Sequence, residues 1–279
     1  DAPAVKYLED YRFTGSIRGY RDGELYFPGS PILTVEGTFA DAVVLETLAL
    51  SVLNHDSAVA TAASRMSIAA GERPLAEMGS RRAAEHSAVA AARAAYIAGF
   101  SATSNLEAGR RWGIPTMGTA AHSWTLLHDT EEQAFRAQVD SLGTGTTLLV
   151  DTYDIRTGVE TAIRVAGTEL GGVRIDSGDL PIVAAEVRTQ LDELGATGTR
   201  ITVTSDLDEY AIAALAASPV DSYGVGTSVV TGSGYPTASM VYKLVARQDS
   251  DGSWVGVAKA SADKASHGGR KAAFRTIED

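Results

Sequence analysis

The chain has 279 residues, of which 44% are hydrophobic, so it is long enough to bury one large α/β core or one large and one small core. Its 35 acidic residues outnumber its 24 basic residues, and the net charge of −11 argues against nucleic acids and acidic membranes as partners. The absence of cysteine excludes disulfides, thiolate catalysis and zinc–thiolate sites. No membrane-spanning run or signal peptide is visible, so we expect a cytoplasmic protein. The chain starts at Asp1 instead of Met, as a fragment would.

The first 70 residues mix β-like and helical patterns. Residues 1–37 open with a short helical pattern, and β-like runs follow at residues 17–20, 24–27 and 32–35. Residues 38–70 have helical periodicity, with a predicted break near residues 54–56.

The pattern at the end of the chain is again β-like. Apolar runs at residues 240–246 and 254–259 flank a polar loop that is long enough to form a hairpin. We therefore predict that residues 1–37 and 236–279 form one small α+β domain, and that residues 38–235 form the catalytic domain.

Short apolar runs alternate with helical patterns from residue 74 onwards. The apolar runs cover residues 75–78, 96–100, 115–118, 147–150, 172–175, 201–204 and 222–225. The helical patterns cover residues 83–95, 106–112, 131–142, 157–166, 180–194 and 207–217. Such alternation is typical of a parallel sheet that helices cover. We predict an α/β fold with a closed or nearly closed β/α barrel, and a doubly wound open sheet is the alternative.

A polar cluster follows each apolar run, whereas the joints at the other ends of the strands are small residues such as those at 195–198. The clusters lie at residues 79–82, 102–105, 118–122, 151–154, 176–179, 205–208 and 224–227. The carboxyl ends of barrel strands share one face, and barrel active sites form there. This asymmetry predicts an enzyme.

Histidine and aspartate follow two of the predicted strands. His122 comes after a glycine–threonine strand end, and Asp151 stands at the end of the next strand. A carboxylate bonded to one imidazole nitrogen fixes the tautomer and frees the other nitrogen as a nucleophile or base. The alternative for His122 is a helix-start residue with local hydrogen bonds.

An arginine lies inside the predicted strand 172–175. Because a buried unpaired guanidinium is costly, Arg174 needs an anionic partner, either an aspartate in a structural ion pair or a bound ligand. Asp176 at the strand tip suits ribose hydroxyls or Mg²⁺. Arg81 and Arg82 could hold a carboxylate or a pyrophosphate, or remain solvated.

The last polar cluster offers backbone N–H groups and a hydroxyl to a phosphate, through Gly224, Gly226 and Thr227. No histidine–carboxylate cluster with metal-ligand spacing is present, and no Walker A or dinucleotide-binding fingerprint is present. The residues alone therefore predict a β/α barrel enzyme that acts on a phosphorylated, ribose-containing substrate.

Several of these stretches together resemble the nicotinate phosphoribosyltransferase family, over essentially the whole chain. The resemblance is carried by residues 95–100, 104–105, 118–122, 150–154, 173–180, 205–209, 223–227, 241–244 and 268–271. It implies the type II phosphoribosyltransferase fold, and the conversion of nicotinate and phosphoribosyl pyrophosphate to nicotinate mononucleotide and pyrophosphate. It also implies coupling to ATP hydrolysis, a requirement for Mg²⁺ and a homodimer.

The resemblance also implies a role for each matching residue. His122 would be phosphorylated by ATP, and Asp151 would orient it. Nicotinate would contact Thr119, Arg174, Arg81 and Ser104. The phosphoribosyl group would contact Asp176, Ser177, Gly178, Ser205, Asp206, Gly224, Gly226 and Thr227, with Mg²⁺ near Asp176 and Asp151.

Two features depart from the family pattern. A further N-terminal stretch with a ring-stacking tyrosine is not found, and Met78 stands where many members carry an aromatic residue. Two alternatives therefore stay open: an enzyme that prefers nicotinamide, and a fragment that binds phosphoribosyl ligands without turnover.

Overall fold

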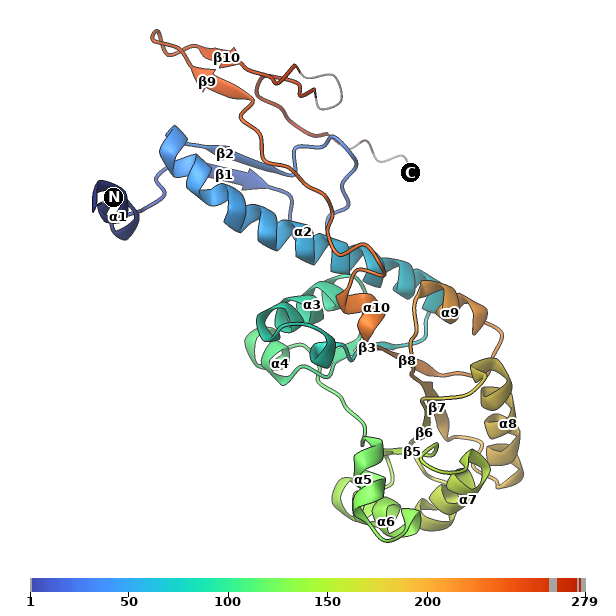
Figure 1. Cartoon of the computed structure of the whole chain (residues 1–279). Coiled ribbons are helices and arrows are strands. Elements are labelled where there is room, and N and C mark those ends of the chain that lie inside the picture. Colours follow the sequence, from blue (N-terminus) through green and yellow to red (C-terminus); the bar gives the residue numbers. More distant parts are fainter. Residues whose placement is uncertain (1, 261–264, 275, 277–279) are drawn as a thin grey trace. The chain divides into compact units, whose positions relative to one another are not determined.

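The computed structural model describes residues 2–260, 265–274 and 276 (Figure 1). The chain divides into two compact units, one formed by Asp1–Asn54 and Ser239–Asp279, and the other by His55–Ala238. The domain boundaries expected from the sequence stay a prediction.

The unit made from both chain ends contains one short helix, part of a long helix and two antiparallel strand pairs. It includes α1 (Ala2–Glu9), the pair β1 (Ser16–Gly19) and β2 (Leu33–Glu36), the beginning of α2 (Phe39–Ala70), and the hairpin β9 (Ala246–Gln248) and β10 (Trp254–Gly256). The expected strand at residues 24–27 is wrong, because both of its ends lie in turns: Glu24 N–H bonds Arg21 O, and Ser30 N–H bonds Phe27 O. None of the described residues of this unit is buried.

The other unit is built on a parallel sheet of six strands in the order β4-β3-β8-β7-β6-β5. The strands are β3 (Leu75–Glu77), β4 (Ala102–Thr103), β5 (Thr147–Leu149), β6 (Gly172–Ile175), β7 (Arg200–Val203) and β8 (Ser222–Val225). The strands follow one another in the circular order of a barrel. In the described part of the chain, the sheet is open between its two edge strands, β4 and β5. The α/β prediction is confirmed, with the sheet curled into half a barrel instead of a closed one (Figure 1).

Two of the predicted strands are absent or nearly so. Residues 96–100 form the end of α3 (Glu85–Ile97) and a turn at Gly99, where φ is 111°. The alanine-rich run before them favours continuation of the helix, since alanine has the highest helix propensity. Residues 115–118 contribute one parallel bridge, between Thr103 and Thr116.

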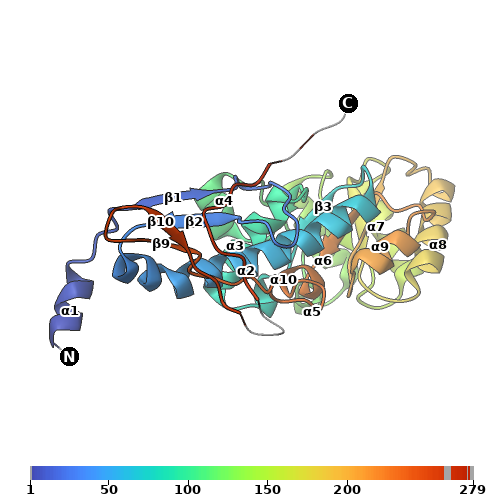
Figure 2. The ribbon, with the colours of Figure 1, turned by 90° about the horizontal axis from the view of Figure 1, so that it is seen from above.

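Helices cover the outside of the sheet, and neighbouring helices α6, α7 and α8 pack in sequence (Figure 2). They are α4 (Leu106–Trp112), α5 (His122–Leu127), α6 (Glu131–Leu142), α7 (Ile155–Ala166), α8 (Leu180–Glu193), α9 (Glu209–Ala214) and α10 (Thr227–Val230), and the short 3-10 helix at Ser80–Arg82 follows β3. Side chains cap four of these helices at their N-termini: Asn105, Thr130, Asp154 and Asp208. No helix in the described residues combines the length and hydropathy that crossing a bilayer requires.

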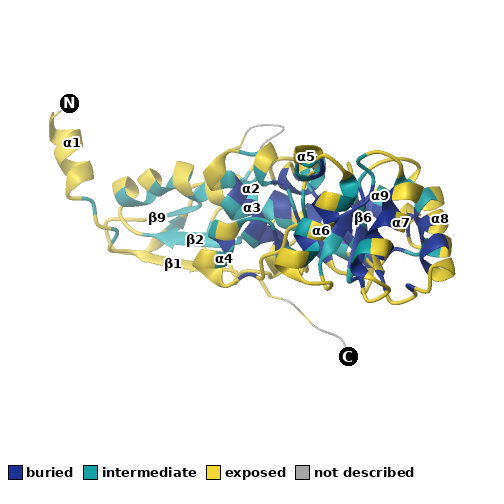
Figure 3. Cartoon of the chain, turned by 90° about the horizontal axis from the view of Figure 1, so that it is seen from below, coloured by how far each residue is buried: buried dark blue, intermediate teal, exposed yellow. Residues whose placement is uncertain are grey.

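The long helix α2 is unbroken, so the predicted break near residues 54–56 is wrong. The polar side chains there do not compete with the helix backbone, because Asn54 accepts from Met240 N–H and His55 Nδ1 lies 2.9 Å from Asp56 Oδ1. The buried residues gather in the sheet and in the helix faces packed on it (Figure 3). Fully buried strand residues such as Val173, Ile201 and Val225 form the core that holds the strand ends in place.

Candidate functional site

The functional groups lie at the carboxyl ends of the parallel strands. Asp151 follows β5, Asp176 follows β6, Thr204 follows β7 and Gly226 follows β8. Because the strands are parallel and adjacent, their carboxyl ends meet at one edge of the sheet. This edge is where the sequence predicts the site.

Asp151 is the centre of one hydrogen-bond network. Its side chain is 1% exposed, and Oδ1 lies 3.0 Å from His122 Nε2. Oδ2 accepts from the Asp176 N–H at 2.8 Å and from Ser177 Oγ at 2.7 Å. Since a carboxylate only accepts, His122 Nε2 carries the proton, and Nδ1 of the neutral ring carries the lone pair. The side chain of His122 is 40% exposed, so the ring is partly open to solvent.

Arg174 is the centre of a second network. Its side chain is 13% exposed, and Nε donates to Thr204 Oγ1 at 2.8 Å. Nη1 donates to Thr119 Oγ1 at 2.7 Å and to Ala120 O at 3.4 Å, while Nη2 lies 3.1 Å from Asp176 Oδ1. The anionic partner that the buried guanidinium requires is therefore Asp176.

A pocket of about 230 Å³ lies next to both networks. Its lining consists of Met78, Arg81, Arg82, Asp176, Ser205, Asp206, Gly226 and Thr227. Arginine side chains and a hydroxyl suit phosphate oxygens, and the aspartates suit hydroxyl groups or a cation. The backbone of Ser205 has φ of 108°, a conformation that is strained in a residue with a side chain and that clusters at functional sites.

The structure brings only part of the predicted phosphoribosyl set to this pocket. Ser177 donates to Asp151 instead, and neither Gly178 nor Gly224 lines the pocket. Gly224 packs inside the sheet, where an added Cβ would lie 2.7 Å from Thr204 Cγ2. Ser104, expected to contact nicotinate, donates its N–H to Glu77 O at 2.8 Å and does not line the pocket.

Two residues of this region were not singled out from the sequence. Glu77 is fully buried at the end of β3 and accepts from Gly79 N–H and Thr103 Oγ1. Burial raises the pKa of Glu77, and its bonds tie β4 to the loop that carries Arg81. Thr204 bridges Arg174 and Asp176. The only sequence signal was a polar residue at the end of an apolar run.

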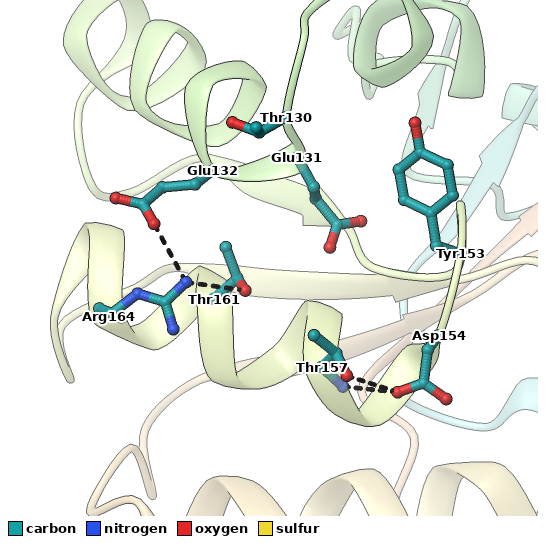
Figure 4. Close-up of a pocket in the computed structure, with 8 residues that line it drawn as sticks. All are labelled: Thr130, Glu131, Glu132, Tyr153, Asp154, Thr157, Thr161 and Arg164. Carbon is teal, nitrogen blue, oxygen red and sulfur yellow. Dashed lines mark hydrogen bonds and ion pairs between the residues drawn. The ribbon is translucent and has the colours of Figure 1, made fainter.

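A second pocket, of about 380 Å³, lies between the N-terminal end of α6 and one side of α7 (Figure 4). It is lined by Thr130, Glu131, Glu132, Tyr153, Asp154, Thr157, Thr161 and Arg164. Burial, and then the charge of Asp154, raise the pKa of Glu131 to about 6. Arg164 is bonded to Glu132 at 3.1 Å and Asp154 caps α7, so most of the charged groups here are already paired. None of the predicted site residues lines this pocket.

Comparison with known proteins shows which proteins the chain is similar to. No family model matches the chain. The chain is 62% identical over 283 aligned positions to nicotinate phosphoribosyltransferase pncB1 of Mycobacterium tuberculosis, and the alignment covers 99% of this chain. Over almost its whole length, the chain is similar to nicotinate phosphoribosyltransferases. It spans 62% of the length of that relative.

Two solved structures resemble the chain in fold. The crystal structure of nicotinate-nucleotide pyrophosphorylase from Pyrococcus furiosus has a TM-score of 0.74 and 25% identity, covering 86% of this chain and 68% of that one. The crystal structure of human nicotinic acid phosphoribosyltransferase has a TM-score of 0.72 and 29% identity, covering 81% of this chain and 58% of that one. The chain therefore shares its fold with both structures over more than four fifths of its length.

Proposed function

We propose that this chain carries the site at which nicotinate and phosphoribosyl pyrophosphate become nicotinate mononucleotide and pyrophosphate, a step of NAD biosynthesis. The observation that carries the proposal is the presence of two arginines and two aspartates in the lining of one strand-end pocket, beside the His122–Asp151 pair. The 62% identity to a nicotinate phosphoribosyltransferase supports the choice of substrates.

Different residues of the site would contact different groups of the substrates. Arg81 and Arg82 would hold the pyrophosphate, and Thr227 and the backbone at Gly226 would hold the 5′-phosphate. The reacting ribose carbon gains positive, oxocarbenium-like character as pyrophosphate leaves, so positioning and charge stabilisation would supply most of the rate. Thr119 and Arg174 would contact the nicotinate.

The donor set fits Mg²⁺ through Asp176 and Asp206, which both line the pocket. Magnesium takes one or two carboxylates together with substrate phosphate oxygens, so the lack of a larger ligand cluster in the described residues is compatible with it. Bound Mg²⁺ would neutralise charge on the pyrophosphate. Asp151 fits less well than expected, because both of its oxygens are bonded within the protein.

His122 would accept a phosphoryl group from ATP through Nδ1, because Nε2 is bonded to Asp151. In that step the Nδ1 lone pair attacks the γ-phosphorus, the bond to the bridging oxygen breaks, and ADP leaves. Water later cleaves the N–P bond. Asp151 would keep Nε2–H in place and stabilise the charge of the phosphorylated ring.

The test is product formation from labelled nicotinate, phosphoribosyl pyrophosphate and Mg²⁺, with and without ATP. We expect nicotinate mononucleotide, formed faster with ATP, and His122→Ala should remove only the ATP-dependent gain. Excess nicotinamide should compete weakly; strong competition would favour the nicotinamide-preferring alternative. Ligand binding without product would favour the binding fragment. The proposal also includes a homodimer in the cytoplasm. Sedimentation of the purified chain measures its oligomeric state and so tests the homodimer.

A further inference from the structure

We propose that Thr204 is a positioning residue that decides which atoms of Asp176 and Arg174 face the substrate. The inference deepens the proposed function and rests on it for its kinetic test. Thr204 is 4% exposed and is the first residue after β7. Its own N–H bonds Ile175 O at 2.9 Å, so its backbone is tied to the neighbouring strand β6.

The hydroxyl of Thr204 connects both charged groups at once. It accepts from Arg174 Nε at 2.8 Å and donates to Asp176 Oδ1. A threonine hydroxyl has one proton and two lone pairs, so it can make both bonds together. A side chain without a hydroxyl could make neither.

The result is an asymmetric Asp176 carboxylate. Oδ1 accepts a hydrogen bond from the Thr204 hydroxyl and forms an ion pair with Arg174 Nη2 at 3.1 Å, whereas Oδ2 has no protein partner among the residues that the structure describes. These two contacts on one oxygen hold the carboxylate against rotation. Oδ2 is therefore left to the pocket that Asp176 lines, as the oxygen for a ribose hydroxyl or for Mg²⁺.

Thr202 provides a matched control on the same strand. It is also buried, at 8% exposed, and its hydroxyl lies 2.8 Å from Ser222 Oγ, away from the charged pair. Valine has nearly the shape of threonine without the hydroxyl. Thr202→Val and Thr204→Val thus remove equivalent groups, but only the second should loosen Asp176 and Arg174.

The kinetic test compares Thr204→Val, Thr204→Ser and Thr202→Val. Loss of a charge-assisted hydrogen bond is worth about tenfold in binding, so Thr204→Val should raise the KM for phosphoribosyl pyrophosphate, and the Mg²⁺ concentration for half-maximal rate, by about tenfold. The KM for nicotinate should change less, because Arg174 keeps its hydrogen bonds to Thr119 and Ala120 O. Thr204→Ser should restore the KM for phosphoribosyl pyrophosphate and the Mg²⁺ requirement. Equal effects of the two valine variants would overturn the proposal.

A second measurement needs no turnover and separates this proposal from the proposed function. In ¹⁵N-edited NMR spectra, the Arg174 Nε–H should exchange slowly with solvent in the unmodified chain and in Thr202→Val, and rapidly in Thr204→Val. Protected Nε–H in Thr204→Val, or lost protection in Thr202→Val, would overturn the positioning role. Absence of product from the unmodified chain would instead count against the proposed function alone.

Discussion

Replacing Asp151 by asparagine should reverse the tautomer of His122. Oδ2 of Asp151 accepts from two donors, Asp176 N–H and Ser177 Oγ, whereas Oδ1 meets one nitrogen, His122 Nε2. An asparagine amide will therefore keep its oxygen on the side of the two donors and turn its NH₂ toward the ring. Nε2 must then accept, and the proton moves to Nδ1, the nitrogen that the proposed phosphorylation uses.

The size of the effect follows from the cost of turning the amide over. With the NH₂ toward Asp176, the backbone N–H of that residue loses its acceptor, while the Ser177 hydroxyl can rotate and accept. One buried unsatisfied donor costs about 1–3 kcal/mol. The reactive tautomer should therefore fall roughly 5- to 150-fold in population, and the phosphorylation rate with it.

The assay is the rate of phosphoryl transfer from labelled ATP to His122, together with the ¹⁵N imidazole shifts at a pH where the ring is neutral. Ser177→Ala is the control, because it removes one donor to Oδ2 and leaves the bond between Asp151 Oδ1 and Nε2. An Asp151→Asn protein with Nε2 still protonated, or with unchanged phosphorylation, would refute the reasoning.

Three further changes test the surroundings of the site by the free energy of unfolding. Ser205→Gly should raise it by about 1 kcal/mol, because glycine adopts φ of 108° without strain; a decrease would mean that the hydroxyl matters more. Gly224→Ala should lower it by about 1–3 kcal/mol, since the new Cβ would overlap a neighbouring methyl, whereas Gly198→Ala meets open space and should be neutral. Because burial raises the pKa of Glu131 from 4.5 to about 6, the folded chain holds that proton longer than the unfolded chain, and stability falls as pH rises across this interval. Glu131→Gln should remove this fall in pH-dependent thermal unfolding. Hydrogen-bonded arginines lower the pKa of Glu132, so this carboxylate makes the folded chain more stable as pH rises toward 4.5. Glu132→Gln should remove that gain and leave the fall due to Glu131, and equal pH profiles of the two variants would contradict both assignments.

The strands that carry the site were predictable because they are short apolar runs bounded by glycine, proline or polar residues. Residues 172–175 and 222–225 match β6 and β8 as the structure has them. Residues 96–100 failed because an alanine-rich helix runs into them, and local patterns do not separate a helix end from a buried strand. The open edge between β4 and β5 could not be predicted, because local sequence patterns carry no information about which distant segments pair.

Part of the candidate site could be placed from the sequence at the level of residues, but not at the level of atoms. The rule that functional groups follow barrel strands placed Asp151 beside His122, and the structure has them 3.0 Å apart. Thr204 was missed because a threonine at the end of a strand is common, and its importance comes from what two neighbouring strands place around it. Glu77 was missed for the same reason: its partners, Gly79 and Thr103, come from different segments.

The bonds of Arg174 also limit how it can recognise an acid. A guanidinium has five N–H groups. Three of those of Arg174 donate to Thr204, Thr119 and Ala120 O, and Nη2 forms an ion pair with Asp176, which occupies a fourth. One N–H on Nη2 remains, so a nicotinate carboxylate would receive a single bond from Arg174 instead of the usual bidentate pair. The Thr119 hydroxyl accepts from Arg174 and still has its own proton to donate. Under the proposed function, selectivity for the acid over the amide would therefore come from Arg174 and Thr119 together, and the buried charge would serve mainly to hold Asp176 and this hydroxyl in place.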